Sequence, residues 1–298
     1  MTERVEGTII RALSGFYYVR CPDGVVTCRA RGRFRADGTT PLVGDRAVVE
    51  RTADMTGVVA ELLPRKNAFR RPAVANVDCI VMLASEAIPV TDPYLIDRVA
   101  VRCAKNGCGA AVVINKCDLA PGDGLAAVYA PTGYPVFRVS AATGLGIDGL
   151  RAWTRGRTLC FTGNSGVGKS SVLNALDASL DIPTGEVSRK LGRGRHTTRH
   201  VELFDLGGDT YIADTPGFAS FGDDREEPIW PEELPALFPE FAPCLGGCRF
   251  DDCTHRGEPG CAVREAVDRG EIHPARYASY LRLHDEASQL KRWEIEHQ

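Results

Sequence analysis

The sequence predicts three domains: a small N-terminal β-barrel of the OB type (residues 1–66), a central α/β domain (67–222) and a mainly helical C-terminal domain (223–298). Three observations predict this order. Short apolar runs separated by glycine turns fill the first 65 residues, apolar strands alternate with helical patterns in the centre, and a Cys/His cluster lies near the end. A chain of 298 residues is long enough for this division.

Composition and charge are those of an ordinary globular protein, with 44% hydrophobic and 25% charged residues. Residues 1–75 carry 13 Arg and Lys against 8 Asp and Glu, whereas residues 223–298 carry 9 against 17. A basic front and an acidic back suit a protein that faces a polyanion with one side. There is no apolar run of about 18 residues and no signal-peptide core at the N-terminus. We therefore expect no membrane span, a cytoplasmic location and, by default, a monomer.

The predicted barrel consists of five strand-like runs with turns such as Ser14-Gly15 between them. These runs are Glu6–Leu13, Phe16–Cys21, Val25–Arg31, Arg46–Arg51 and Gly57–Leu63. Arg29, Arg31, Arg33 and Arg35 alternate along one strand and its loop, with Phe34 between them, so period-two spacing places the arginines on one face. Arginines near the aromatic run Phe16–Tyr18 suit contact with RNA. An ordinary solvated strand face is the alternative.

The eleven cysteines are an odd number in a long chain without a secretion signal, which favours reduced thiols over a disulfide framework. Cys79, Cys103 and Cys160 lie in apolar runs and are predicted to be core residues.

The central domain is predicted to be a doubly wound sheet. The apolar runs Cys79–Ala84, Ala110–Ile114, Pro135–Val139 and Thr158–Thr162 read as its parallel strands. Asp92 caps a helix with Pro93 at its first position, and its predicted buried stripe is Leu95, Ile96, Val99, Ala100 and Cys103. Val201–Phe204 and Thr210–Ala213 are predicted to pair through a Gly207-Gly208 turn. Polar motifs follow several of these strands, where ligands of such sheets bind.

The central motif is a phosphate-binding loop that matches G-x-x-x-x-G-K-[ST] between a predicted strand and a predicted helix. Gly166 and Gly168 let backbone N–H groups approach phosphate oxygens, and the helix dipole adds positive charge. Lys169 is predicted to reach the β- and γ-phosphates, and the Ser170 hydroxyl to bind Mg²⁺. A chance glycine turn is the alternative. The residues predicted to bind nucleotide are Gly163, Asn164, Ser165, Gly166, Val167, Gly168, Lys169, Ser170 and Ser171.

The tetrad Asn115-Lys116-Cys117-Asp118 predicts guanine as the base. A carboxylate such as that of Asp118 accepts two hydrogen bonds from guanine N1–H and N2–H₂, which adenine lacks. Asn115 is expected to bond the base edge, the Lys116 stem to lie over the ring, and the Ala141 N–H of Ser140-Ala141 to meet guanine O6. The rival class is a P-loop kinase or metabolic ATPase, and Asp118 argues against it.

The motif order is permuted relative to ordinary GTPases, which begin with the phosphate loop. Here the order is Asn115–Asp118, Ser140-Ala141, Gly163–Ser170, Thr197/Thr198 and Asp214–Gly217. The same sheet can be cut at a different loop, so this order predicts a circularly permuted GTPase domain. The segments that sense nucleotide then lead directly into the C-terminal domain.

The C-terminal cluster has the spacing Cys248-x₄-Cys253-x-His255-x₅-Cys261, which supplies three thiols and one imidazole. Such a donor set predicts one closed, structural zinc site without a catalytic role. Cys244 lies just outside the pattern and is not expected to be a ligand. A helical tail is predicted from about Pro274, with Tyr277, Leu281 and His284 on one face.

Together, the permuted motifs, the barrel and the zinc knuckle resemble the bacterial ribosome small-subunit-dependent GTPase A family over nearly the whole chain. The connector Asn67–Asp78 and the loop Gly194–Thr198 share in this resemblance. It implies hydrolysis of GTP to GDP, stimulated by the 30S subunit during late maturation. It also implies binding to 16S rRNA through the barrel, and release after hydrolysis.

The resemblance also suggests roles for the residues that follow the phosphate loop. Phe218 stands where many GTPases place a water-orienting Gln, so His196 is the candidate catalytic group, with phosphate or RNA contact as its alternative role. Thr197 or Thr198 is expected to reach Mg²⁺ and the γ-phosphate. Asp214 would hold Mg²⁺ through water and Gly217 would bond the γ-phosphate. Three further residues are candidates for charge neutralisation or rRNA contact: Arg193, Arg195 and Arg199.

Two other readings remain open from the sequence. One is an RNA-binding scaffold in which guanine nucleotide only orders the fold, and the intact Lys169, Ser170 and Asp214 weigh against it. The other is a permuted GTPase that serves a different RNA client.

Overall fold

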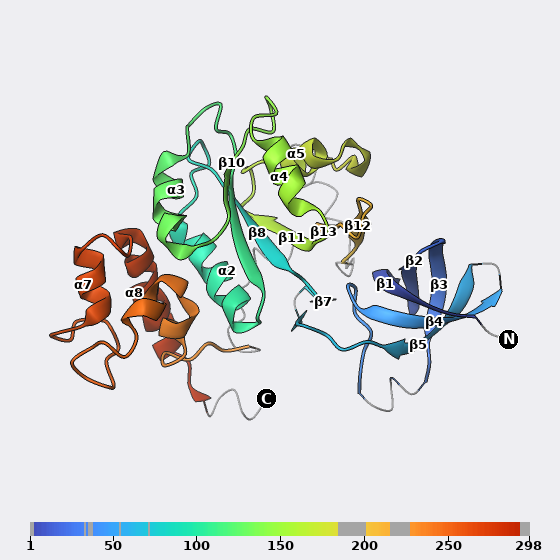
Figure 1. Ribbon diagram of the computed structural model, residues 1–298, viewed down its shortest axis with the longest axis horizontal. Helices are drawn as coiled ribbons and strands as arrows, with labels where there is room; N and C mark the ends of the chain where they lie inside the picture. The colour runs from blue at the N-terminus through green and yellow to red at the C-terminus, as the bar shows by residue number, and fades with distance from the viewer. Residues whose placement is uncertain are drawn as a thin grey trace.

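A computed structural model shows three parts in a row: a β-barrel, a central sheet flanked by helices, and a helical C-terminal part (Figure 1). The structure describes residues 3–32, 34, 38–53, 55–70, 72–183, 201–214 and 227–292. Within these ranges no helix has the length and apolar character needed to cross a membrane.

The N-terminal part is a closed barrel, as predicted. Its strands are β1 (Arg4–Leu13), β2 (Phe16–Cys21), β3 (Gly24–Ala30), β4 (Arg46–Ala53) and β5 (Thr56–Leu62). They close in the order β1-β2-β3-β5-β4, with β3 and β5 parallel and the other pairs antiparallel. Its core includes Ile9, Val19, Val26, Val49 and Val59. Closure leaves no strand edge unpaired.

The structure tests only part of the predicted arginine face of the barrel. Arg29 is exposed and its guanidinium lies 4.6 Å from the centroid of the Phe16 ring. Arg31, just after the end of β3 at Ala30, is also exposed, and its guanidinium bonds Glu50. Phe34 is 7% exposed and packs in the barrel core, because burying an aromatic ring is more favourable than leaving it in water. Arg33 and Arg35 lie outside the described residues.

The central sheet has six strands in the order β10-β9-β8-β11-β13-β12. These are β8 (Cys79–Ala84), β9 (Gly109–Ile114), β10 (Val136–Arg138), β11 (Thr158–Gly163), β12 (Leu203–Asp205) and β13 (Tyr211–Asp214). All pairs are parallel except β12 with β13, which form the predicted strand pair. A short hairpin, β6 (Ala68–Phe69) with β7 (Val74–Ala75), connects the barrel to this sheet.

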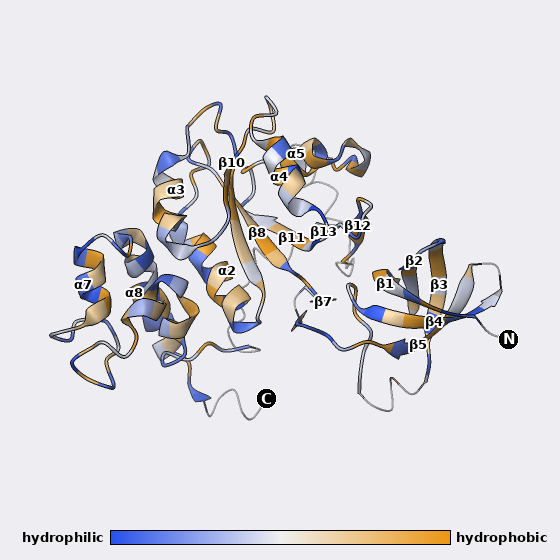
Figure 2. Cartoon of the chain, viewed as in Figure 1, coloured by the Kyte–Doolittle hydropathy of each residue, from blue (hydrophilic) through white to orange (hydrophobic). Residues whose placement is uncertain are grey.

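Helices cover both faces of the sheet, and the sequence of β8 shows why. Its alternate residues point to opposite faces. Ile80, Met82 and Ala84 pack toward α2 (Pro93–Lys105) and α3 (Asp123–Tyr129). Cys79, Val81 and Leu83 pack toward α4 (Ile147–Thr154) and α5 (Lys169–Leu176). Figure 2 shows the resulting apolar strands enclosed by helices whose outer faces are polar.

Helix α2 confirms its predicted start, since the Asp92 side chain accepts from the Tyr94 amide and Pro93 follows. Cys103 and Cys160 are fully buried, and Cys79 is 6% exposed, as predicted. The prediction for Leu95 is wrong, because this residue is 38% exposed. The buried face instead continues through Tyr94 and Val101, which pack against the C-terminal part.

The barrel lies against the edge of the sheet at β12. Arg11 of β1 makes an isolated antiparallel bridge with Glu202, and the Arg20 guanidinium lies 2.6 Å from the Asp205 carboxylate. Ile10 and Ala12 of β1 pack onto the sheet core.

Within the described residues, the C-terminal part contains the 3₁₀ turns η4 (Leu234–Leu237) and η5 (Pro239–Cys244) and the helices α7 (Ala262–Asp268) and α8 (Pro274–Ser288). It packs on α2, as Figure 1 shows. Arg276 of α8 is 1% exposed and bonds the carboxylates of Asp97, in α2, and Glu240, in η5. On α8, His284 is buried, and Tyr277 and Leu281 pack beside it against the same core.

Candidate nucleotide and metal sites

The phosphate-binding loop runs from Gly163 at the end of β11 to α5, whose first residue is Lys169. Gly166 and Gly168 have φ of 87° and 91°, which side chains disfavour. A Cβ at Gly168 would also lie 2.4 Å from the Nδ2 atom of Asn115. Val167 is fully buried and anchors the loop, whereas Ser165 and Gly166 are exposed. The loop is therefore a backbone cradle at a helix N-terminus, an arrangement that binds phosphate.

Asn115 holds the phosphate loop and the base-recognition motif together. It follows β9 and is 3% exposed. Its Nδ2 atom donates to the Val167 carbonyl (2.9 Å), and its Oδ1 atom accepts from the Ala141 amide (3.1 Å). One side chain thus ties together segments that follow β9, β10 and β11.

The structure places Ala141 beside Asn115. Its N–H donates to the Asn115 Oδ1 atom, and its contact with guanine O6 stays a prediction. Ser140 is fully buried, and its hydroxyl accepts from the Thr143 amide, so it shapes this loop from inside.

Lys116 and Asp118 lie on the outer side of the same motif. Lys116 has φ of 64° and its Nζ atom donates to the Ile88 carbonyl at 2.7 Å. The Asp118 side chain is exposed, where it is accessible to a base. The backbone of Asp214 ends β13, beside Phe161 of β11.

Several predicted residues lie outside the described ranges, and the structure does not test them. These are His196, Thr197, Thr198, Gly217, Arg193, Arg195 and Arg199. For Asp214 only the backbone is described.

The described motifs meet at one end of the sheet. Asn115 and Ser140 follow the adjacent strands β9 and β10, Gly163 ends β11 on the other side of β8, and β13 ends in Asp214. Carboxyl ends of parallel strands form one edge, so the phosphate cradle and the exposed Asp118 carboxylate lie on the same side of the sheet. This arrangement suits a guanine nucleotide.

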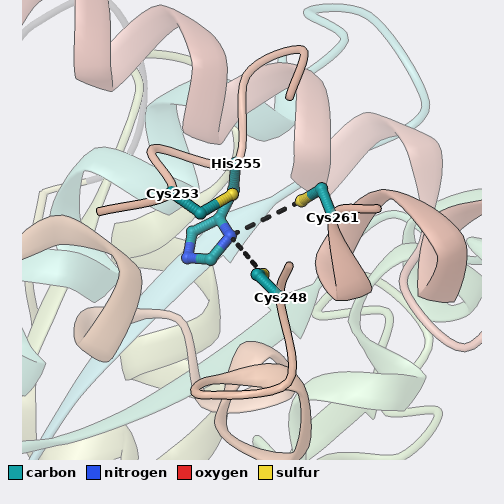
Figure 3. A group of neighbouring side chains, drawn as sticks. All are labelled: Cys248, Cys253, His255 and Cys261. Atoms are coloured by element: carbon teal, nitrogen blue, oxygen red, sulfur yellow. Dashed lines mark hydrogen bonds between the residues drawn. The ribbon is translucent and has the colours of Figure 1, made fainter. Parts of the chain in front are cut away.

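A second group of functional side chains lies in the C-terminal part. The ligand atoms of Cys248, Cys253, His255 and Cys261 all lie within 4.8 Å of one another. The Nδ1 atom of His255 is 3.5 Å from both the Cys248 and the Cys261 sulfur atoms, and the Cys253 side chain completes the group (Figure 3). All eleven cysteines are free thiols, as predicted. Three thiols and one imidazole at this spacing can hold a metal ion.

The polypeptide around this cluster is fixed by hydrogen bonds. The Tyr277 hydroxyl donates to the His255 carbonyl (2.7 Å), and the Tyr280 hydroxyl to the Thr254 carbonyl (2.6 Å). The Glu258 carboxylate accepts from the amides of Thr254 and Arg256. Cys244 is buried outside the cluster, in agreement with the prediction.

Sequence analysis missed two features of these sites: the double tether by Asn115, and the contact of Lys116 with the loop that follows β8. A tetrad read by itself indicates what faces the ligand. Which neighbouring segments the tetrad holds depends on the order of the strands in the sheet. The one feature of the sequence that pointed to these contacts was the predicted position of the tetrad and the phosphate loop at strand ends.

Comparison with known proteins agrees with this arrangement. A family model described as RsgA GTPase matches residues 62–223, and one described as RsgA N-terminal domain matches residues 6–59. A protein of Halalkalibacterium halodurans named small ribosomal subunit biogenesis GTPase RsgA is 44% identical over 287 residues, which cover 94% of this chain and 96% of that protein. A protein of Moorella thermoacetica with the same name is 45% identical over 279 residues, covering 93% and 95%.

Solved structures are similar over almost the whole length. The crystal structure of YjeQ from Thermotoga maritima has a TM-score of 0.83 and 34% identity, and the match covers 97% of this chain and 100% of that one. The structure described as YloQ, a circularly permuted GTPase, has a TM-score of 0.80 and 34% identity, covering 97% and 96%. The second similarity agrees with the permuted motif order.

Proposed function

The chain belongs to the RsgA GTPase family and hydrolyses GTP, and we propose that this hydrolysis serves maturation of the small ribosomal subunit. The observation that carries the proposal is the agreement over nearly the full length with relatives named for that process, together with the phosphate cradle and the exposed Asp118 at one sheet edge. The 30S subunit is the partner that this implies.

For nucleotide binding, we assign the roles that the geometry supports. The backbone between Gly163 and Ser171 holds the phosphates, with Lys169 neutralising the β- and γ-phosphates. Asp118 reads the guanine edge, and Lys116 lies beside the ring. Asn115 holds these parts in register through Val167 and Ala141.

Mg²⁺ suits the oxygen donors around the γ-phosphate. We propose that the hydroxyls of Ser170 and of Thr198 or Thr197 bind it, with Asp214 acting through water. The ion would neutralise charge that develops on the phosphate oxygens. Gly217 is the proposed backbone donor to the γ-phosphate.

For catalysis, we propose that His196 orients the attacking water, because Phe218 cannot do so. Contact of His196 with phosphate or RNA remains the alternative. Arg193, Arg195 and Arg199 are proposed to contact rRNA or to neutralise charge.

We propose Zn²⁺ as the occupant of the Cys248, Cys253, His255 and Cys261 group. Sulfur and nitrogen donors in a closed set of four suit a structural zinc ion. Burial lowers the pKa of His255, which favours the neutral imidazole that a metal requires. The ion would fix the fold of this segment and take no part in hydrolysis.

We propose that the barrel binds 16S rRNA, with the exposed Arg29 and Phe16 pair as one contact. We also propose that the protein is monomeric and cytoplasmic, and that its domain boundaries lie near residues 66 and 222. Membership of a GTPase family does not favour the hypothesis of a non-enzymatic scaffold. The scaffold hypothesis predicts that ribosomal subunits do not stimulate hydrolysis.

The test is GTP turnover by the purified protein alone, with 30S subunits and with 50S subunits, for the wild type and for His196→Ala. We expect a large stimulation by 30S subunits only, reduced by about 10²-fold or more in the variant. If 30S subunits changed nothing, the scaffold reading would lead. Stimulation that survived in His196→Ala would keep the proposed function and move the catalytic role to another group.

A further inference from the structure

A loop that the predicted motifs do not include lies between the two halves of the nucleotide site. This bridging loop, Ser85–Thr91, follows β8 and precedes α2. The Ile88 carbonyl accepts from the Nζ atom of Lys116 at 2.7 Å. On its other side, Pro89 lies 3.2 Å from the position that a Cβ would take on Gly166. The bridging loop therefore touches the base motif and the phosphate loop at the same time.

The bridging loop is closed on itself, so it can act as a firm support. The Thr91 amide donates to the Ser85 carbonyl (2.8 Å), and the Ser85 amide donates to the Thr91 hydroxyl (3.0 Å). The Ser85 hydroxyl donates to the Ala87 carbonyl at 2.9 Å. Ser85 and Thr91 are 0% and 4% exposed, so water does not compete for these bonds.

Glu86 of the bridging loop caps the helix that continues the base motif. Helix α3 begins at Asp123, so only residues 119–122 separate it from Asp118. Its N-cap is Gly122, where φ is 79° and a Cβ would lie 2.7 Å from the Ile114 side chain. A capping side chain is therefore excluded at the usual position.

Glu86 supplies the missing cap from a distant segment. Its Oε1 atom accepts from the Leu125 amide, the third residue of α3, at 2.6 Å. This amide is one of the donors that a helix leaves unpaired at its first turn. Gly124 leaves room for the contact, since a Cβ there would lie 2.8 Å from the same oxygen.

We infer that Glu86 is a positioning residue for guanine recognition. It holds the first turn of α3 and, through the short segment between α3 and Asp118, fixes the carboxylate that reads guanine N1–H and N2–H₂. The Lys116 contact with Ile88 secures the other end of the tetrad to the same loop. The inference rests on the proposed nucleotide site and names a determinant of its base selectivity.

The test compares the dissociation constants of GDP and IDP, the nucleotide that lacks the 2-amino group. One hydrogen bond to a carboxylate is strong enough that we expect wild-type protein to prefer GDP by about 10-fold or more. In Glu86→Ala the ratio of the two constants should fall to about threefold or less, because a displaced Asp118 loses the 2-amino contact. A purely structural effect of the substitution would weaken the binding of GDP and IDP equally and leave the ratio of their dissociation constants unchanged.

Three further variants sharpen the result. Glu86→Gln keeps an oxygen acceptor and should restore the ratio. Gly124→Ala displaces the Glu86 carboxylate without removing it, whereas alanine itself stabilises a helix. A lowered GDP-to-IDP ratio in this variant would therefore reflect lost positioning and not a weaker helix. Asp123→Ala removes a carboxylate of the same first turn that pairs with the exposed Arg138 side chain, and this variant should keep the wild-type ratio.

An unchanged ratio in Glu86→Ala or in Gly124→Ala would overturn the inference, as would an equal loss in Asp123→Ala. Should Glu86→Ala not fold, Gly124→Ala carries the test. If the wild-type protein bound neither GDP nor IDP, the proposed function itself would fail, which distinguishes the two failures.

Discussion

At the scale of single residues, Arg276 is a deeply buried charge held by several partners. It is 1% exposed, its Nε atom lies 2.6 Å from Glu240, and it also bonds Asp97, which the Tyr129 hydroxyl contacts at 2.9 Å. These residues come from four separate elements. A charge this deep is tolerated only when it is paired, so its partners depend on it.

Replacing Arg276 with Ala should lower the free energy of unfolding by about 3–5 kcal/mol, because two buried carboxylates lose their counter-charge. Urea denaturation measures the change. The control is Arg269→Ala, which removes an exposed arginine that pairs with Glu271, and it should leave the unfolding midpoint nearly unchanged. Equal effects of the two substitutions would contradict the prediction.

His284 makes stability depend on pH. It is 6% exposed, and burial, followed by the positive charge of Arg256, lowers its pKa below the ordinary value of 6.5. The unfolded chain therefore binds a proton more readily than the folded chain. The contribution of neutral His284 to the free energy of unfolding is fully present above about pH 6.5. It falls as the pH drops below this value, by at most about 1.4 kcal/mol per pH unit for one proton.

Replacing His284 with Gln should reduce this pH dependence. The measurement is urea denaturation of wild-type and variant protein at pH 7.5 and 5.5. We expect the wild type to lose more stability than the variant between these two conditions. The same loss in both proteins would show that His284 is not the responsible group.

At the scale of elements, the metal group depends on a turn and on helices together. Cys261 precedes α7, and α8 supplies the tyrosines that hold the backbone of residues 254 and 255. A metal ion bound by the four side chains would join a segment that has little other secondary structure.

Replacing Cys253 with Ala should reduce bound zinc from about one equivalent per chain to well below that value, because three ligands leave the site open. Metal content is measured on purified protein by mass spectrometry. The matched control is Cys244→Ala, which removes a thiol whose pKa is raised by burial and which lies outside the group. Loss of zinc in this control as well would show that the ligand set is wrong.

At the scale of the whole molecule, the barrel is held to the connector at a glycine. Gly44 has φ of 89°, its amide donates to the Ile9 carbonyl (2.7 Å), and its carbonyl accepts from the Asn76 side chain (2.9 Å). A Cβ at this position would lie 2.0 Å from the Ala75 carbonyl oxygen. The close approach of two backbones thus fixes how the barrel meets the connector.

Replacing Gly44 with Ala should destabilise the protein by about 3 kcal/mol or more, since backbone strain and a backbone clash add. Thermal unfolding measures the loss. Gly15→Ala is the matched control, because Gly15 has φ of 80° but open space around it, and only strain of about 1–2 kcal/mol is expected there. A Gly44 variant no less stable than the Gly15 variant would contradict this account.

The sequence by itself determined what depends on neighbouring residues. The strands of the barrel and sheet, the glycine cradle before Lys169, the start of α2 at Asp92 and the four-residue metal group are all local patterns, because period, capping and backbone freedom act over a few positions. The position of Asp118 after a parallel strand was predictable for the same reason.

Only the tertiary structure decided which distant groups meet. Asn115 bonds Val167, Glu86 bonds Leu125, and Asp97 bonds Arg276, although 52, 39 and 179 positions separate them. The error at Leu95 has the same origin: this residue is exposed because packing surfaces, rather than period alone, select the buried face. Strand order and helix packing set these contacts, and no short stretch of sequence encodes them.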